Sequence, residues 1–252
     1  MACDIRVGTS GWHYKHWRGD FYPQDLPSSR MLSHYVQHFD TVELNNSFYR
    51  LPTEAAFQAW RDSVPQDFVF AVKASRFITH HIKLKDPLQA VQNLIPRAEN
   101  LGRKLGPFLF QLPPGWRVNV ERLQGLLAVL PRRHLYAFEF RDNSWHTAGV
   151  LDLLRRNNAA LCLFHLAGFS SPAEITADFA YVRLHGPGGK YQGSYSDAEL
   201  RSWAARINEW SGKLKAIYVY FDNDQAAYAA HDAARLKRIL ATPRQQLNAE
   251  AA

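Results

Sequence analysis

Residues 136–141, with the sequence YAFEFR, alternate aromatic side chains with small or charged ones. Successive side chains of a β-strand point to opposite faces, so the three aromatic residues share one face and Ala137, Glu139 and Arg141 share the other. An aromatic face suits packing against helices. A face that starts small and ends charged suits the inside of a barrel, where polar side chains gather at the carboxyl ends of the strands. The stretch therefore predicts a barrel strand with Glu139 and Arg141 near the mouth.

Seven other β-prone runs accompany this strand along the 252-residue chain. The eight runs cover residues 5–8, 41–45, 68–73, 108–111, 136–141, 161–165, 181–185 and 217–222. Helix-compatible stretches lie near residues 28–39, 53–63, 87–105, 119–130, 147–157, 196–211 and 225–240, and the sixth connection has room only for a short helix. Thr53 and Ser196 are expected N-caps, and Asp86 is expected to cap a helix with Pro87 in its first turn. This alternation predicts parallel strands joined by right-handed crossovers.

The predicted fold is an α/β, TIM-type (β/α)8 barrel, a single domain over residues 1–240 with a weakly ordered tail over residues 241–252. An open doubly wound sheet is the alternative, although no glycine fingerprint follows the first run. The two cysteines, Cys3 and Cys162, fit a reducing compartment. Neither a secretory signal nor an apolar run of about 18 residues is found, so we expect a cytoplasmic protein without a membrane partner. The oligomeric state is not predicted.

The same alternation puts charged side chains on the inward phase of other runs, close to their ends. These are Glu43, Lys73, Arg183, His185 and Asp222, in addition to Glu139 and Arg141. His165 is expected to end the inward phase of the sixth run, and Arg6 to lie inside the first. Because burying an unpaired charge is costly, the ring must pair internally or meet solvent and ligand. An ion-pair network that seals the barrel is the structural alternative.

A glycine-rich loop follows the seventh run, with the sequence HGPGGKYQGSY over residues 185–195. It matches neither the P-loop spacing nor the dinucleotide-binding spacing. Many barrels nevertheless hold phosphate on the loops after strands seven and eight, and glycines let backbone N–H groups approach an anion. We therefore interpret the loop as a candidate anion cradle, in which Gly188 supplies backbone and Lys190 supplies charge.

These patterns assign roles within one candidate site at the barrel mouth. The candidate catalytic residues are Glu43, Glu139, His185 and Lys73. The candidate substrate-binding residues are Trp12, Asn45, Arg141, Arg183, Gly188, Lys190, Tyr220 and Asp222. Acid–base chemistry needs two titratable groups with different environments, and Glu43 with Glu139 is the proposed pair. A divalent metal held by Glu43, Glu139, His185 and Asp222, with His165 as a further ligand, is the alternative, but the cations in the ring favour a metal-free anion site.

Aromatic residues among basic ones fill the loops at the same end. The loop after the first run carries Trp12, Tyr14, Trp17, Phe21 and Tyr22. Such loops suit stacking on bases or sugars, and the formal net charge of +7 favours anionic partners, either a small molecule or nucleic acid. A loop that packs on its own aromatic centre is the alternative, and we prefer it for the loop after the first run.

Several sequence blocks resemble the YecE-like family of uncharacterised proteins. The blocks are VGTSGWHYKHWRGDFYP at residues 7–23, VELNNSFYRLP at 42–52, FVFAVKAS at 68–75, FLFQLPP at 108–114, FEFRDNSW at 138–145, YVRLHG at 181–186 and YVYFDN at 218–223. The resemblance covers nearly the whole chain and implies a divergent (β/α)8 barrel, with no established reaction. By fold analogy alone, it implies a likeness to xylose-isomerase-like and endonuclease-type barrels that bind divalent metals.

Two functional hypotheses follow. The first is an enzyme that acts on a phosphate-bearing substrate (a nucleotide, nucleic acid or sugar phosphate) by acid–base catalysis, as a hydrolase, a phosphoesterase or an isomerase. The second is a non-catalytic protein that binds nucleic acid or nucleotides through its basic, aromatic rim, with affinity that falls steeply with salt. A small-molecule sensor is a third interpretation that the sequence leaves open.

Overall fold

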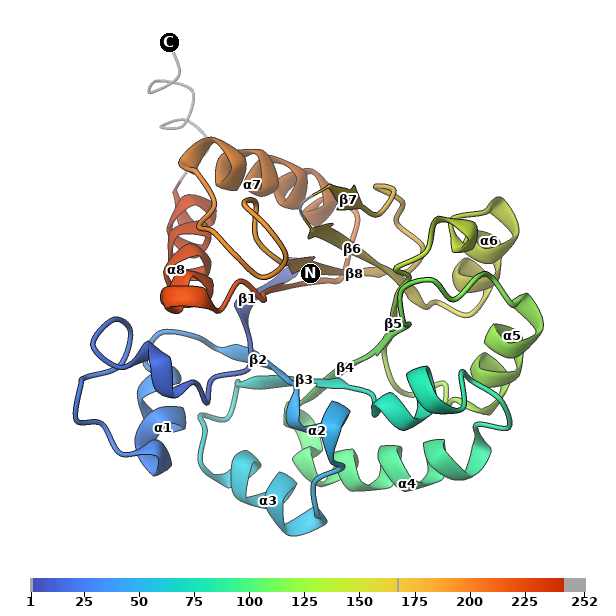
Figure 1. Ribbon diagram of the computed structural model, residues 1–252, viewed down its shortest axis with the longest axis horizontal. Helices are drawn as coiled ribbons and strands as arrows, with labels where there is room; N and C mark the ends of the chain where they lie inside the picture. Colours follow the sequence, from blue (N-terminus) through green and yellow to red (C-terminus); the bar gives the residue numbers. More distant parts are fainter. Residues whose placement is uncertain (1, 167, 243–252) are drawn as a thin grey trace.

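Eight parallel strands close into a barrel in the computed structural model, which describes residues 2–166 and 168–242 (Figure 1). The barrel strands are β1 (Asp4–Ser10), β2 (Thr41–Leu44), β3 (Val69–Lys73), β4 (Leu105–Gln111), β5 (Tyr136–Glu139), β6 (Ala160–Leu166), β8 (Phe179–Leu184) and β9 (Ala216–Phe221). Their order is β5-β4-β3-β2-β1-β9-β8-β6, and pairing of β5 with β6 closes the ring. The TIM-type barrel is confirmed, and the open sheet is excluded.

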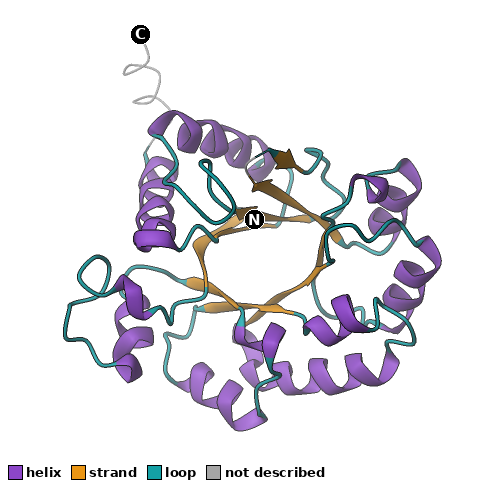
Figure 2. Cartoon of the chain, viewed as in Figure 1, coloured by secondary structure: helices purple, strands orange, loops and turns teal. Residues whose placement is uncertain are grey.

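Helices surround the strands on the outside of the barrel, as Figure 2 shows. They are α1 (Met31–Tyr35), α2 (Asn46–Tyr49), α3 (Glu54–Asp62), α4 (Leu88–Ala98), α5 (Val120–Val129), α6 (Ala148–Arg156), α7 (Asp197–Ser211) and α8 (Tyr228–Ala241). Short turns of helix are η1 (Lys15–Trp17), η2 (Ser28–Arg30), η3 (Phe77–His81), η4 (Glu99–Lys104), η5 (Asn143–Trp145) and η6 (Gln225–Ala227). All seven predicted helices are present, whereas α2, η1, η3 and η5 were not predicted. The predicted tail begins inside α8, and its residues from 243 onward lie outside the described ones.

Helix caps agree with the sequence at two of the three expected positions. The side chain of Thr53 accepts a hydrogen bond from the Ala56 N–H, and Ser196 forms a reciprocal capping box with Glu199. Asp86 does not cap α4, because Pro87 occupies the N-cap position and makes no side-chain bond there. Asp86 itself lies at a φ of 43° in the preceding turn.

The ring of helices is incomplete after β6. In place of the expected short helix, the described part of this connection contains strand β7 (Phe169–Ser170), which pairs antiparallel with the end of β6 (Figure 1). The short segment carries Pro172 and polar residues on either side of it, which favour extended backbone over a helix. β7 thus lies beside β6 in the sheet, and a pocket lined by Leu163 and His165 of β6 and by Trp203 of α7 opens where a helix would otherwise cover β6.

Two separate cores match the two faces of the strands. The larger lies between barrel and helices and contains the aromatic face of β5. The inner core consists of Ala71, Leu109, Ala137, Ala160, Cys162, Phe179, Tyr181, Ala216, Tyr218 and Tyr220. Alanines on β3, β5 and β6 share this inner core with tyrosines on β8 and β9, so large and small side chains fill the barrel together. This packed floor leaves the polar residues at the carboxyl ends of the strands above it.

The loop after β1 packs on its own aromatic residues, as preferred from the sequence. Trp17 and Tyr22 are buried, and the Tyr22 hydroxyl donates to the Trp12 carbonyl at 2.5 Å. Phe21 lies edge-on to Tyr22, with ring centroids 4.9 Å apart. These side chains form a hydrophobic centre for the loop and are not free to stack on a ligand. No helix among the described residues combines the length and apolar character needed to cross a membrane.

Gly8 is required by the close approach of β1 and β2 inside the barrel. A Cβ at this position would lie 2.3 Å from the Thr41 carbonyl oxygen. We expect Gly8→Ala to lower the free energy of unfolding by about 1–3 kcal/mol in urea denaturation. Gly125, an exposed residue of α5 with open space around its Cβ position, is the matched control. Gly125→Ala should instead raise stability by about 0.5–1 kcal/mol, and a similar loss in both variants would contradict the close-approach explanation.

Candidate functional site

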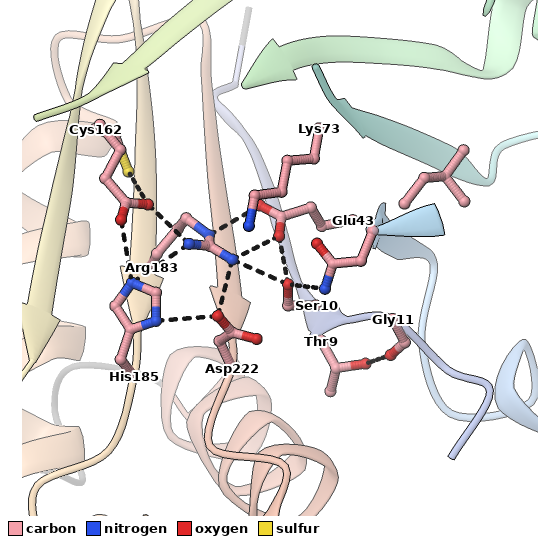
Figure 3. Close-up of polar contacts among 12 residues, drawn as sticks. Thr9, Ser10, Gly11, Glu43, Lys73, Cys162, Arg183, His185 and Asp222 are labelled. Atoms are coloured by element: carbon pink, nitrogen blue, oxygen red, sulfur yellow. Dashed lines mark hydrogen bonds and ion pairs between the residues drawn. The ribbon is translucent and has the colours of Figure 1, made fainter. Parts of the chain in front are cut away.

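A single buried guanidinium organises the carboxyl ends of the strands. Arg183, on β8, donates from Nε and Nη2 to Glu43 at 3.0 and 2.8 Å and from Nη1 to Glu139 at 2.7 Å. Its Nη2 also donates to Asp222 at 2.9 Å and to Ser10 Oγ at 3.1 Å. Figure 3 shows Arg183 joined by dashed lines to Glu43, Ser10 and Asp222. One cation thus connects carboxylates from β2, β5 and the end of β9.

Arg183 therefore has no donor left for a ligand. Its side chain is fully buried, and Nε and both Nη atoms donate to partners within the barrel. Burial alone would lower its pKa, but the charges of Glu43, Glu139 and Asp222 raise the pKa well above its usual value. The predicted role of Arg183 as a substrate-binding residue does not fit this geometry. It is the centre of the ion-pair network that the sequence left as the alternative.

Glu43 and Glu139 are engaged in the same network. Glu43 accepts from the Tyr181 hydroxyl at 2.6 Å and from Ser10 Oγ, in addition to Arg183. Glu139 accepts from Arg141 Nε at 2.5 Å. Burial would raise the pKa of Glu139, but the two neighbouring guanidiniums lower the pKa well below its usual range. Both carboxylates are fully buried and neither lines the pocket at the barrel mouth, so the predicted proton-transfer pair does not fit this arrangement.

His185 lies between two carboxylates and two guanidiniums. Its Nδ1 is 3.0 Å from Asp222 Oδ2, and its Nε2 is 3.4 Å from Arg183 Nη1 (Figure 3). The same Nε2 is 3.4 Å from Arg141 Nη2 and 3.6 Å from Glu139 Oε1. The imidazole is fully buried beneath the ring of Tyr191, with centroids 5.4 Å apart. His185 therefore positions Asp222 from below and is screened from a ligand by Tyr191.

A pocket of about 340 Å³ opens directly above this network. It is lined by Gly11, Trp12, His13, Tyr14, Asn45, Asn46, Tyr49, Lys73, Tyr191, Asp222 and Asp224. Four predicted site residues are among them, namely Trp12, Asn45, Lys73 and Asp222. Asp222 belongs to both layers, because its Oδ2 bonds the network while the side chain stays 13% exposed toward the pocket. Burial would raise the pKa of Asp222, but Arg183 and His185 lower it.

Lys73 differs from every other cation of the ring in having no counterion. Its Nζ lies 4.4 Å from the centroid of the Phe48 ring, and the hydrogen bonds and ion pairs found among the described residues do not include this amine. The side chain is 8% exposed and opens into the pocket. Burial, followed by repulsion from Arg183, lowers the pKa of Lys73 to about 8. About a tenth of this lysine is therefore neutral at pH 7 and about half at pH 8, far more than for an ordinary lysine.

Asn45 presents a buried acceptor that has no partner. The Ser10 hydroxyl gives its proton to Glu43, so it must accept from Asn45 Nδ2, which lies 2.7 Å away. This fixes the orientation of the amide and leaves Asn45 Oδ1 buried without a hydrogen bond. Buried polar atoms normally find a partner, so this oxygen calls for a donor from a ligand or water in the pocket.

The glycine loop after β8 closes on itself. The Gly188 N–H donates to the Gln192 carbonyl at 3.3 Å, and the Gln192 N–H donates to the Gly189 carbonyl at the same distance. Gly188 and Lys190 are exposed and do not line the pocket. The loop instead contributes Tyr191, whose hydroxyl accepts from Arg141 Nη1 at 3.0 Å. Gly188 and Lys190, the predicted anion-binding residues of this loop, therefore do not lie at the pocket.

Two further predictions are corrected. His165 points outward, where its Nδ1 contacts the Tyr195 hydroxyl at 3.0 Å, because Cys162 and not His165 shares the inward register with Tyr181. Tyr220 lies fully buried in the inner core, with its hydroxyl 2.8 Å from Thr41 Oγ1, and cannot contact a ligand. Arg6, inward as predicted, pairs with Asp4 at the opposite end of β1.

The sequence also missed residues of the site. Ser10 was interpreted as part of a tight turn, although counting by two from Arg6 reaches it on the inward face. Tyr14, Asn46 and Tyr49 line the pocket from loops and from α2, where no alternation rule applies.

The predicted metal ligands do not converge on one point. Glu43, Glu139, His185 and Asp222 surround Arg183, whose charge stands at their centre. Across residues 2–166 and 168–242, no group of three or more His, Cys, Asp or Glu side chains has the arrangement of a metal site.

Comparisons with known proteins agree on one family. A family model described as "Protein of unknown function DUF72" matches residues 6–252. The UPF0759 protein YunF of Bacillus subtilis (strain 168) is 26% identical over 278 residues, which cover 94% of each chain. The UPF0759 protein YecE of Escherichia coli (strain K12) is 29% identical over 146 residues, 58% of this chain and 51% of that protein.

Solved structures similar to this chain also belong to the DUF72 family. A DUF72 family protein from Thermotoga maritima MSB8 has a TM-score of 0.87 at 30% identity, covering 95% of this chain and 100% of that chain. A DUF72 family protein from Enterococcus faecalis V583 has a TM-score of 0.80 at 19% identity, covering 95% and 96%, and shows likeness of fold. The YecE-like resemblance noted in the sequence is confirmed, and the chain belongs to the DUF72 family.

Proposed function

We propose that this protein is an enzyme that transfers protons on a small hydroxyl-bearing substrate held in the pocket at the barrel mouth. The observation that carries the proposal is the unpaired Lys73 amine in a pocket that also presents the Asp222 carboxylate. Burial and Arg183 lower the pKa of Lys73 to about 8, whereas the pKa of Asp222 is lowered by Arg183 and His185 despite its burial. At pH 7 the amine is mostly protonated and the carboxyl group is ionised, so within one pocket Lys73 can give a proton and Asp222 can accept one.

The pocket lining supports a neutral, hydroxyl-rich substrate. Asn45 Oδ1 is a buried acceptor without a partner, and Asp222 and Asp224 add carboxylates. Aromatic side chains of Trp12, Tyr14, Tyr49 and Tyr191 form the walls. Acceptors between aromatic walls suit hydroxyl groups on a small carbon skeleton, as in a sugar.

The phosphate group expected from the sequence has weaker support. Lys73 is the one lysine or arginine that lines the pocket within the described residues, since the donors of Arg183 are all engaged. Asp222 and Asp224 would repel a phosphate. A nucleic-acid binder has less support still, because Trp17, Tyr22 and Trp145 are buried in their loops and offer no stacking surface. We keep the cytoplasm as the proposed compartment, with Cys3 and Cys162 both free thiols.

The test is deuterium incorporation from heavy water into candidate substrates, followed by NMR. The panel contains short aldoses and ketoses and the phosphate ester of each, so it also decides between neutral and phosphorylated substrates. We expect exchange with a neutral member, and we expect Lys73→Met and Asp222→Asn to slow it by about 10²–10⁴-fold. Lys190→Met, outside the pocket, is the control and should leave the rate unchanged. Absence of both exchange and binding across the panel would rule out the proposed function.

A further inference from the structure

We propose that Lys73 is a nucleophile that forms an imine with the carbonyl carbon of an aldehyde or ketone bound in this pocket. The inference rests on the proposed function and names the chemical class of its substrate, a hydroxy-aldehyde or hydroxy-ketone. It assigns to Lys73 a covalent role that proton transfer alone does not require.

The environment of Lys73 keeps its amine free of ion pairs, which would hold it in the protonated form that cannot act as a nucleophile. Arg183 takes up the three nearby carboxylates of Glu43, Glu139 and Asp222, so none is paired with the amine. Phe48 covers the amine on one side, at 4.4 Å from the ring centroid. Burial and the neighbouring guanidinium lower the pKa of Lys73 to about 8. A desolvated lysine beside another cation is the arrangement that yields a nucleophilic amine near neutral pH.

The position of the amine also suits a carbonyl substrate. Lys73 is the last residue of β3, at the carboxyl end of the barrel, and its side chain lines the pocket. The volume of about 340 Å³ lies at the lower end of the range for small-molecule sites. A substrate hydroxyl would donate a hydrogen bond to Asn45 Oδ1, which has no partner. The site thus offers one nucleophile, one acceptor for an adjacent hydroxyl and one carboxylate for proton transfer.

The step balances without an additional reactant. The lone pair of neutral Lys73 Nζ attacks the carbonyl carbon, and the C=O π electrons move to oxygen, which takes up the proton that the nitrogen loses. This carbinolamine then takes up a proton from solvent on its oxygen. The C–O bond breaks, water leaves, and the nitrogen lone pair forms the C=N bond of a protonated imine. The positive nitrogen draws electrons from the adjacent carbon, so a base such as Asp222 can remove the proton there.

Reductive trapping tests the proposal on the full chain. The protein is incubated with glyceraldehyde and cyanoborohydride, which delivers hydride to the C=N bond and leaves a stable secondary amine. Peptide mass mapping then compares Lys73 with the exposed Lys190 in the same molecule, so the comparison does not depend on the folding of a variant. At pH 7, the neutral fraction of an amine with a pKa about 8 exceeds that of an ordinary lysine about 10²–10³-fold. We expect labelling of Lys73 to be at least about tenfold faster, with a rate that rises with pH and levels off above pH 8.

The outcomes separate this inference from the proposed function. Selective labelling of Lys73, lost in Lys73→Met and kept in Lys190→Met, supports the imine. Labelling spread over exposed lysines with Lys73 unmodified overturns it. Deuterium exchange without trapping leaves the proposed proton transfer intact and refutes the imine, whereas trapping without exchange supports the imine and refutes the proposed proton transfer.

Discussion

Replacing Arg183 with methionine is expected to lower the free energy of unfolding by about 3–5 kcal/mol or more, enough to leave a marginally stable protein largely unfolded. The variant removes the cation that bonds Glu43, Glu139 and Asp222 and leaves these carboxylates inside the barrel without a full counterion. Breaking a buried ion pair from one side is costly because the remaining charge stays desolvated. Here, one substitution removes the cation from three buried ion pairs and leaves the three carboxylates behind.

Urea denaturation followed by circular dichroism measures this effect. Arg155→Met is the matched control, because Arg155 forms exposed ion pairs with Asp152 and Glu174. Such surface pairs contribute about 0–1 kcal/mol, so the control should remain close to the wild type. Equal stability of Arg183→Met and Arg155→Met would show that the buried network does not hold the barrel together.

The stability of Arg183→Met at acid pH shows whether the variant loses stability through lost charge pairing or through a cavity alone. Arg183 lowers the pKa of Glu139 and Asp222 against the effect of burial, so these groups contribute stability that is present above about pH 4 and is lost as the pH falls. In Arg183→Met, the opposing effect of burial remains without its compensation. The variant should therefore regain stability relative to the wild type as the pH falls and the carboxyl groups take up protons. A difference that stays constant with pH would indicate packing alone.

The strands and the polar ring could be predicted from alternation because each barrel strand has one apolar outer face. Tyr136 and Phe138 in β5 and Phe140 directly after it fix that face, and Glu139 is then placed inward without ambiguity. In β6, the sequence ALCLFHL is apolar on both faces, so nothing in it fixes the register. A one-residue slip there moves every side chain to the other face, and His165 was assigned inward for this reason.

The roles of the ring residues could not be predicted, because they depend on distances across the barrel. In sequence, Arg183 and Lys73 look alike, as inward cations near strand ends. In space, Arg183 reaches three carboxylates and becomes a structural centre, while Lys73 reaches none and faces the pocket. The aromatic loop after β1 was open to two interpretations for the same reason, since only packing shows that Trp17 is buried.

Lys73→Met should raise the stability of the folded protein at pH 7, while it removes activity. The pKa of Lys73 is lowered from 10.5 to about 8, a difference of about 2.5. At about 1.4 kcal/mol for each pH unit, holding the amine charged in the fold costs about 3 kcal/mol, and methionine fills a similar volume without that charge. Lysines with such a cost are retained where function needs them, and their removal exchanges activity for stability.

The pH dependence fixes the sign of this prediction. Between about pH 8 and 10.5, the unfolded wild-type chain holds more protons than the folded one, so the stability of the wild type rises with pH in this window. The advantage of Lys73→Met should therefore be complete at pH 7, shrink through the window and vanish above it. Urea denaturation at pH 7 and at pH 10 measures the difference, with Lys190→Met as an exposed control expected within about 0.5 kcal/mol of the wild type. If Lys73→Met is less stable at pH 7, the amine contributes to the fold through contacts and is not the uncompensated cation on which the proposed chemistry depends.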